Sequence, residues 1–267
     1  MKLLDLKNPF NAPVYHEEIV SSTFDVARAL AQKNENHGTV ITADFQEAGR
    51  GKAARPWVTE KGKNLLFTIL LRYGHFSSIP EALTLRTGLA VSLAVEDLVP
   101  SLSGSIQVKW PNDIMIGSRK LAGILTEGDG KNVFIGVGVN VSQREFPGEY
   151  QSRAGSIIQA IPGLGENARF ALLEHILSRL YEEIEVPQKA CASQEAGAGQ
   201  NTGLWRERLL ERLYKKGELV TFAEGPADSN CLTEGTLSGL GPGGELLIVP
   251  RGGTTERAFV AGELRVY

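Results

Sequence analysis

The hydrophobic pattern of this 267-residue chain changes at Lys216. Upstream, segments with apolar side chains at helical spacing alternate with short β-branched runs bounded by Gly, Asn, Asp and Pro. Downstream, only short strand-like runs remain, and turn sequences such as GPGG and RGG separate them. The pattern therefore predicts a mixed α and β body over residues 1–216 and a small β-barrel over residues 217–267.

Four segments have the character of helices. Ser22 offers a hydroxyl N-cap, and Asp25 stands in the position of a capping box. A second helix is expected to begin near Pro80, to carry an almost wholly apolar body, and to stop before Pro100. Apolar stripes predict two more helices, over 167–185 and 204–216. Predicted strands lie between the helices at 39–43, 64–72, 106–110, 121–127 and 133–141.

The segment 188–203 separates the last two predicted helices. It contains no Leu, Ile, Val or aromatic residue. Without such side chains it cannot offset the entropy of ordering, so we expect a mobile insertion.

Composition excludes several classes of protein. The chain has 28 Lys and Arg against 31 Asp and Glu, a net charge of −3, so no broad cationic surface is expected to bind nucleic acid. No apolar run reaches the roughly 18 residues that span a bilayer. Two cysteines, Cys191 and Cys231, and the absence of a secretory signal predict a reducing, cytoplasmic location. The histidines lack metal-ligand spacing, so no protein-ligated metal is predicted: His16, His37, His75 and His175.

A glycine-rich basic segment, QEAGRGKAARPW from Gln46 to Trp57, follows a predicted strand. Its glycines let backbone N–H groups approach an anion, while Arg50, Lys52 and Arg55 supply positive charge. The segment predicts a phosphate or carboxylate clamp, and the alternative is an ordinary basic turn. It is not a P-loop, because Gly51-Lys52 is followed by alanine and not by Ser or Thr.

Charged residues of both signs gather between 109 and 127. A predicted strand ends in Lys109-Trp-Pro-Asn112-Asp113, and the next begins with Arg119-Lys120. Each residue has a purely structural alternative as a turn former, a core side chain or a solvated strand end. The combination indicates that these charges meet where two strands meet.

The segment Gly136-Val-Gly138-Val-Asn140 lacks the last glycine of a dinucleotide-binding loop, and no helix pattern follows it. Glycine alternating with valine instead predicts a strand with one bare face, against which a flat ligand can lie. Asn140 would supply a polar group at the end of that floor.

Together the three segments resemble the biotin protein ligase family, the biotin–[acetyl-CoA-carboxylase] ligases. The resemblance rests on the glycine/arginine loop, on KWPND followed by RKLAGIL between Lys109 and Leu125, and on the GxGxN strand. Ser22-Thr23 matches the family's helix-opening motif, and Gly262-Glu263 belongs to its closing small-barrel pattern. The match covers nearly the whole chain.

This resemblance implies a fold and a reaction. The fold is α+β: a mixed sheet flanked by helices, like class II aminoacyl-tRNA synthetases and biotin ligases, followed by an SH3-like β-barrel. The implied reaction joins biotin and MgATP to give biotinyl-5′-AMP. Biotin then passes to a lysine of a biotin carboxyl carrier protein domain, such as that of acetyl-CoA carboxylase.

Residue roles follow from the same resemblance. Lys120, Arg50 and Asp113 are the implied catalytic residues, with Lys120 holding the biotin carboxylate and the charge that develops on phosphate. The implied biotin-binding residues are Ser22, Thr23, Gln46, Gly49, Arg50, Lys120, Gly123, Leu125, Gly136 and Gly138. Those implied for ATP and the adenylate are Lys52, Arg55, Trp57, Lys109, Asn112 and Asn140. Mg²⁺ would come with the ATP phosphates and could be reached by Asn112.

The sequence differs from the family pattern in the helix-opening motif and in the basic loop. Phe24 replaces the usual asparagine after Ser-Thr, so one polar contact is missing or replaced. Lys52 stands where arginine is common and offers a point charge in place of a forked guanidinium. The alanines at 53 and 54 leave the loop with fewer cations than many relatives have.

Three other functions compete with this interpretation of the sequence. A lipoate protein ligase shares the superfamily chemistry but normally lacks KWPND. A biotinyl-adenylate-dependent repressor needs an N-terminal DNA-binding domain, and about 21 residues before Ser22 are too few for one, so a short form without direct nucleic-acid binding is expected. Intact Lys120, Asp113 and Asn112 argue against a non-catalytic biotin binder. A homodimer is possible, and membrane association is not expected.

Overall fold

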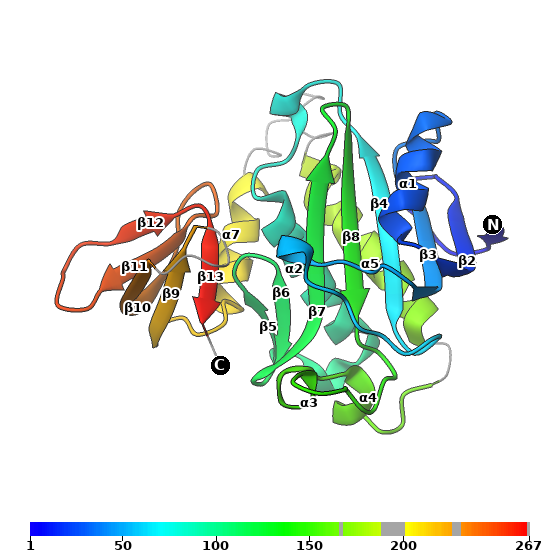
Figure 1. Ribbon diagram of the computed structural model, residues 1–267. Coiled ribbons are helices and arrows are strands. Elements are labelled where there is room, and N and C mark those ends of the chain that lie inside the picture. Colours follow the sequence, from blue (N-terminus) through cyan, green and yellow to red (C-terminus); the bar gives the residue numbers. More distant parts are fainter. Residues whose placement is uncertain (166–167, 188–200, 226–230, 266–267) are drawn as a thin grey trace.

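A computed structural model describes residues 1–165, 168–187, 201–225 and 231–265. Its body is an eight-stranded mixed sheet in the order β1-β2-β3-β4-β8-β7-β6-β5 (Figure 1). Among the described strands of this sheet, β2 and β3 are parallel and the other neighbouring pairs are antiparallel. The strands are β1 (Lys2–Leu4), β2 (Val14–Val20), β3 (Thr39–Gln46), β4 (Leu65–Arg72), β5 (Ile106–Lys109), β6 (Asp113–Ile116), β7 (Arg119–Gly128) and β8 (Asn132–Val139).

Helices cover both faces of this sheet. Helices α2 (Leu83–Leu98) and α5 (Ala168–Ile184) pack on each other and on one face, and α1 (Thr23–Gln32) packs on the other, against β3, β4 and β8 (Figure 1). Helix α7 (Asn201–Glu211) contacts α2. The short helices are η1 (Lys52–Ala54), η2 (Phe76–Ser78), η3 (Pro100–Leu102), α3 (Tyr150–Arg153) and α4 (Ile157–Ala160).

Neighbouring side chains of β7 point into two different hydrophobic clusters. Ile124 belongs to the main core beneath α2 and α5, whereas its neighbour Leu125 packs against the smaller cluster under α1. Successive side chains of a strand point to opposite faces, so the two sides of the sheet are different environments. The main core fills the α2 side, and the α1 side keeps a cavity.

Helix α2 is buried as its sequence predicts, with two differences. It begins at Leu83 and not at Pro80, because Ala82 adopts a left-handed conformation with φ of 52°. Its buried face also holds two charged residues, Arg86 and Glu96, and Arg212 pairs with Glu96 at 3.0 Å. Buried charges are retained in this way only when they are paired.

The start of α1 confirms the predicted cap but not the capping box. The Ser22 hydroxyl accepts a hydrogen bond from the Phe24 backbone N–H. The Asp25 carboxylate instead accepts a hydrogen bond from Ser21 Oγ at 2.9 Å and one from Arg50 at 3.2 Å. The long-range charge of Arg50 has drawn Asp25 away from the local backbone.

The C-terminal residues form a second, antiparallel sheet in the order β12-β11-β10-β9-β13. Its strands are β9 (Leu219–Glu224), β10 (Leu232–Leu240), β11 (Leu246–Pro250), β12 (Arg257–Phe259) and β13 (Gly262–Arg265). Trp110 joins this sheet to the body: its indole N–H donates to the Gly244 carbonyl at 2.9 Å, and its ring lies 5.8 Å from that of Phe222. The predicted small β domain is therefore present, and its closure into an SH3-like barrel stays a prediction.

Several elements differ from the sequence predictions. Strands β1, β2 and β6 and helices α3 and α4 were not predicted. Helix α7 begins at Asn201, so residues 201–203 are helical and not part of a mobile insertion, and it ends at Glu211 and not at Lys216. Trp205 is buried and anchors the helix, and the helical backbone extends through the turn before it. The rest of the expected insertion, 188–200, lies outside the described residues. In the part of the chain that the structure describes, no helix is long and apolar enough to cross a membrane.

Candidate active site

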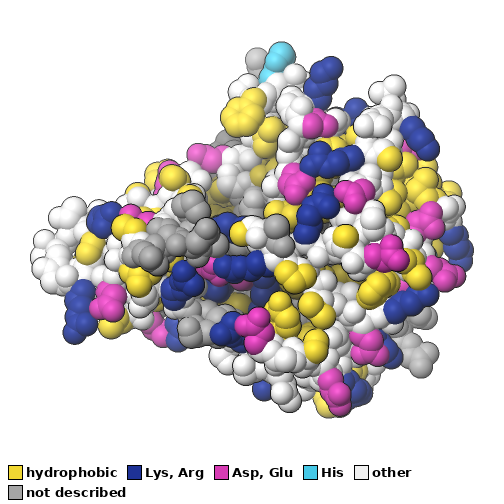
Figure 2. All heavy atoms as spheres, viewed as in Figure 1, with side chains coloured by type: hydrophobic (Ala, Val, Ile, Leu, Met, Phe, Trp, Pro, Cys, Tyr) yellow, Lys and Arg dark blue, Asp and Glu magenta, His cyan; other side chains and the backbone are white. Residues whose placement is uncertain are grey.

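A cavity of about 600 Å³ lies on the α1 side of the large sheet. Strands β7 and β8 form its floor, the loop after β3 covers it, and β13 of the second sheet closes one side. Lys and Arg side chains gather in the middle of this face, where the body meets the C-terminal lobe (Figure 2). The cavity thus combines an uncharged floor with a positively charged rim.

Three glycines, Gly123, Gly136 and Gly138, form what we call the glycine floor. Gly123 faces Gly138 across β7 and β8, and Gly136 faces Leu125. Two aromatic rings lie on this floor. A Cβ at Gly138 would come within 2.6 Å of the Trp57 indole, and a Cβ at Gly136 would overlap the Phe24 ring. The bare strand face expected from the sequence is present, and only glycine fits beneath the rings.

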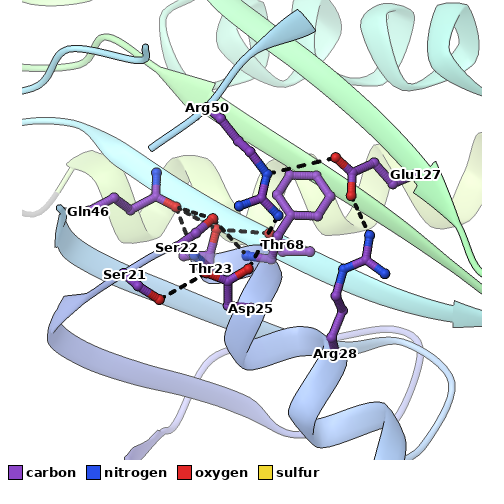
Figure 3. A network of polar contacts seen from close by, with 10 residues as sticks. Ser21, Ser22, Thr23, Asp25, Arg28, Gln46, Arg50, Thr68 and Glu127 are labelled. Carbon is purple, nitrogen blue, oxygen red and sulfur yellow. Dashed lines mark hydrogen bonds and ion pairs between the residues drawn. The ribbon is translucent and has the colours of Figure 1, made fainter. Parts of the chain in front are cut away.

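A polar cluster stands at the Gly136 end of the floor. Gln46 Oε1 accepts hydrogen bonds from the Thr23 backbone N–H at 2.8 Å and from Thr23 Oγ1 at 3.0 Å (Figure 3). Ser22 Oγ donates to the same oxygen at 3.5 Å. Thr68 Oγ1 on β4 donates to Thr23 Oγ1 at 2.8 Å. Ser22, Thr23 and Gln46, which the family resemblance selected, therefore lie together. Thr68 is a fourth member of this cluster, and no sequence motif indicated it.

A cluster of charges stands at the other end, where β5, β6 and β7 are neighbours. Lys120 Nζ lies 2.6 Å from one oxygen of Asp113, and Lys109 Nζ lies 3.8 Å from the other. Lys109 is almost fully buried, and burial lowers its pKa, although the nearby Asp113 and Glu263 carboxylates oppose that shift. The antiparallel pairing of Lys109 with Asp113, and of Asp113 with Gly123, places all of these residues at the edge of the floor.

The three cations of the basic loop do not converge on one point. Arg50 lies over α1, where it pairs with Asp25 at 3.2 Å and with Glu127 at 3.9 Å (Figure 3). Lys52 Nζ donates to the Gly262 carbonyl at 2.9 Å, and Arg55 donates to both carboxylate oxygens of Glu263 at 3.0 and 2.8 Å. Lys52 and Arg55 are thus held by β13, while Arg50 is held at the opposite end of the floor.

The remaining sequence-selected residues hold the backbone around the cavity. Gly49 O accepts from the Trp57 N–H at 2.9 Å, which closes the basic loop on itself. Asn112 Nδ2 donates to the Ile124 carbonyl at 2.9 Å. Asn140 Nδ2 donates to the Gly155 carbonyl at 3.0 Å and so fixes the segment that carries α3. Both asparagines also line the cavity.

Sequence reasoning did not select four residues that the structure brings to the site. Glu127 holds Arg50 and also pairs with Arg28. Glu263 holds Arg55, and Tyr150 lines the cavity from α3. Thr68 completes the polar cluster. The only signal for any of these was the Gly-Glu pair near the C-terminus. In the described part of the chain, no three His, Cys, Asp or Glu side chains form a group that could hold a metal ion.

Residues 17–140 match the model of the biotin/lipoate A/B protein ligase family. This segment therefore contains the domain that the family model describes. It is 36% identical over 173 residues to the bifunctional ligase/repressor BirA of Bacillus subtilis, a match that covers 61% of this chain and 51% of the relative. It is 31% identical over 169 residues to the biotin–[acetyl-CoA-carboxylase] ligase of Mycobacterium tuberculosis, covering 62% of this chain and 59% of the relative. The chain thus spans little more than half the length of these curated relatives.

The solved structures extend the likeness beyond the matched segment. The biotin protein ligase of Aquifex aeolicus in complex with biotin and ATP superimposes with a TM-score of 0.74 at 26% identity, covering 94% of this chain and 97% of that one. The second sheet is therefore included in the likeness. Residues 17–140, which match the family model, include the polar cluster, the basic loop, the glycine floor and the Lys120–Asp113 pair.

Proposed function

We propose that this chain is a member of the biotin/lipoate A/B protein ligase family and that it is a biotin protein ligase. It would activate biotin with MgATP to biotinyl-5′-AMP and pass biotin to a lysine of a carrier protein domain. The observation that carries the proposal is the placement of two unlike clusters at opposite ends of one uncharged floor. An amide-binding cluster, Thr23 and Gln46, stands at one end, and an anion-binding pair, Lys120 with Asp113, stands at the other.

Biotin matches this arrangement in its own chemistry. Its ureido ring offers two N–H donors and a carbonyl acceptor, and its valerate tail ends in a carboxylate. Thr23 Oγ1 and Gln46 provide both donors and acceptors at the Gly136 end. The apolar part of the ligand would cross the glycine floor, and its carboxylate would reach Lys120. Burial of ring and tail against the backbone of the glycine floor is favourable once the Trp57 indole moves away from Gly138.

Adenylation brings two anions together, and the cavity offers cations to screen them. A biotin carboxylate oxygen attacks the α-phosphorus of ATP, a P–O bond forms, and pyrophosphate leaves. Lys120 would hold the incoming carboxylate and the charge growing on phosphate, since an ammonium already positioned in the cavity needs no reorganisation to stabilise both. Lys52 and Arg55 would leave β13 to meet the phosphates, and Arg50 would serve the ring end of the site.

In the second step, the neutral amine of the carrier lysine attacks the acyl carbon, AMP leaves with the bonding electron pair, and the amine loses a proton. Asp113 is the carboxylate nearest to Lys120, and we propose that it orients the attacking amine. Lys120 Nζ and Lys109 Nζ lie 2.6 and 3.8 Å from its two oxygens and hold the carboxylate in place at the edge of the floor.

Mg²⁺ is proposed to accompany ATP, where it would neutralise charge on the phosphates. Asn112 fits this role in one respect. Its amide nitrogen is committed to the Ile124 carbonyl, so its amide oxygen is the atom turned to other partners. An amide oxygen is a ligand that Mg²⁺ accepts. Asn140 and Trp57 would hold the adenine side.

We further propose a catalytic domain over residues 1–216 and an SH3-like C-terminal domain over residues 217–267. The partner would be a biotin carboxyl carrier protein domain of acetyl-CoA carboxylase or another biotin-dependent carboxylase. A cytoplasmic location, a homodimer and the lack of direct contact with nucleic acid stay predictions from the sequence.

Biotin-dependent exchange of pyrophosphate into ATP tests the proposal. The purified chain should catalyse exchange with biotin and MgATP, and it should label a carrier domain at one lysine. Lipoate in place of biotin serves as the matched substrate control. Exchange with lipoate alone would reassign the chain within its family, and no exchange with either acid would overturn the proposed activity.

A further inference from the structure

We propose that Phe24 sets the size limit on the ring that the cavity admits. This inference rests on the proposed function, because it takes the ureido ring of biotin as the group that meets the polar cluster. It goes beyond that function by naming a specificity-determining residue that departs from the family motif. Its basis is the position of the Phe24 ring between the glycine floor and Arg50.

The Phe24 ring takes the place of a side chain on β8. Phe24 is the second residue of α1, and its side chain is only 4% exposed. A Cβ at Gly136 would overlap this ring, so the two residues form a matched pair in which one supplies the volume that the other lacks. The floor is therefore open at Gly123 and Gly138 once Trp57 moves, but it is bounded by an aromatic wall at Gly136.

This wall is fixed in place from above and from behind. The Arg50 guanidinium carbon lies 5.5 Å from the centroid of the Phe24 ring, and both Asp25 and Glu127 hold Arg50 there (Figure 3). Behind the ring, Phe24 belongs to the buried cluster of Ala27, Leu30, Ala31, Ile41, Leu70 and Phe134. A ring packed on both sides cannot swing aside to admit a larger ligand without breaking those contacts.

The wall stands directly beside the groups that would read the ureido ring. Thr23 precedes Phe24 in α1, and its hydroxyl is bonded to Gln46 and Thr68. Thr68 faces Gly136 across β4 and β8, which places the polar cluster and the aromatic wall at the same point of the floor. A ring bound to Thr23 and Gln46 would therefore have its edge against Phe24, with no space for a substituent on that edge.

The expected consequence is discrimination by size at the ureido ring. A methyl group on a ureido nitrogen adds volume where the wall is close, and an overfilled pocket forces strain on its surroundings. The probes are the two biotin isomers that carry a single methyl group on one or the other ureido nitrogen. We expect the native chain to use at least one isomer about tenfold or more less efficiently than biotin.

The experiment compares the native chain with Phe24→Ala and Phe24→Leu. The readout is kcat/KM in pyrophosphate exchange for biotin and for each N-methyl isomer. We expect Phe24→Ala to raise the ratio of methylated to unmethylated biotin by about tenfold for the disfavoured isomer, and Phe24→Leu to raise it by less. Phe170→Ala is the matched control, since Phe170 packs against His16 outside the cavity, and its ratio should equal that of the native chain.

The outcomes separate this proposal from the proposed function. If the native chain exchanges pyrophosphate with biotin but both Phe24 variants keep the native ratio, the size limit lies elsewhere and the role of Phe24 is overturned. If the native chain uses both N-methyl isomers as well as biotin, no size limit exists and the proposal also fails. If Phe24→Ala does not fold, the ratio measured with Phe24→Leu decides. A native chain without biotin-dependent exchange would overturn the function itself.

Discussion

Glu263, on the last described strand of the second sheet, accepts hydrogen bonds from both terminal nitrogens of Arg55 in the basic loop. The two residues are 208 positions apart in the chain. Lys52 reaches the same strand through the Gly262 carbonyl. A loop that would meet ATP phosphates is thus tied to the second sheet, and a phosphate would compete with a carboxylate for Arg55.

Glu263→Gln should therefore release the basic loop. The neutral amide loses the charge-assisted, bidentate contact, which is the stronger kind of hydrogen bond. We expect trypsin to cut after Arg50, Lys52 or Lys61 faster in Glu263→Gln than in the native chain, and biotin plus ATP to suppress cutting in both. Glu234→Gln is the control, because Glu234 pairs with Arg251 in the same sheet away from the loop. Equal cleavage rates in all three proteins would contradict the tie.

The same contact predicts a dependence on pH. The hydrogen bonds from Arg55 lower the pKa of Glu263 below its usual value of 4.5. A carboxyl group with a lowered folded-state pKa stabilises the fold above its unfolded pKa, and that contribution is lost as the pH falls through the folded pKa. For a partly exposed pair the effect is about 0.2–1 kcal/mol. The melting temperature of the native chain should exceed that of Glu263→Gln at pH 7, and the difference should vanish well below pH 4.5. A difference that persists at low pH would show that it does not arise from the charge.

Lys120→Ala should abolish adenylate formation and leave the fold intact. Lys120 is partly exposed and pairs with Asp113 at the edge of the floor, so its loss removes a cation from the site and not a core side chain. Lys61→Ala is the control, since Lys61 is an exposed lysine that pairs with Glu18 at 3.5 Å. Circular dichroism should be unchanged in both. Retention of more than about a tenth of native exchange, a loss of under ~1.4 kcal/mol, would remove Lys120 from the reaction.

Local pattern was enough to predict the floor and one of its ends. Gly136 and Gly138 alternate with valines, and a period of two fixes their shared face whatever the strand pairs with. Lys109, Asp113 and Lys120 are close in sequence, and two antiparallel turns bring them together. In both cases the spacing of the residues along the chain determines which of them lie close together.

Contacts between distant segments could not be predicted in this way. Nothing near Arg55 in the sequence indicates Glu263, because the pair depends on how the second sheet docks through Trp110. The expectation that Arg50, Lys52 and Arg55 surround one anion rested on the basic loop alone and could not take distant carboxylates into account. Carboxylates from α1, β7 and β13 divide these cations between two ends of the site. Strand β1 was missed because a three-residue edge strand is too short to show a period.

Trp57 should report ligand binding through its fluorescence. Its indole covers Gly138, and its N–H is buried without a hydrogen-bond partner among the described residues. A ligand on the floor must move the ring or give its N–H a partner. We expect biotin to change tryptophan emission in the native chain and in Trp205→Phe, but not in Trp57→Phe. An unchanged response in Trp57→Phe would mean that the indole stays where it is when biotin binds.

Lys52 should control how long the adenylate stays bound. Its ammonium donates to the Gly262 carbonyl, and a point charge can screen a phosphate without binding two oxygens in fixed geometry. Lys52→Arg should therefore slow release of biotinyl-5′-AMP with little change in its rate of formation. Lys52→Gly should release the adenylate faster and label lysines of a bystander protein.

The measurement is a chase of pre-formed biotinyl-5′-AMP, with bystander labelling as the second readout. Lys61→Gly is the control for loss of a lysine near the loop, and it should release the adenylate at the native rate. Glu263→Gln adds a further distinction. If the contacts with β13 hold the loop closed over the adenylate, Glu263→Gln should release the adenylate faster. If Lys52 and Arg55 leave β13 when the adenylate binds, Glu263→Gln should release it at the native rate. Identical release from the native chain, Lys52→Arg and Lys52→Gly would reduce Lys52 to a solvated charge at the rim of the site.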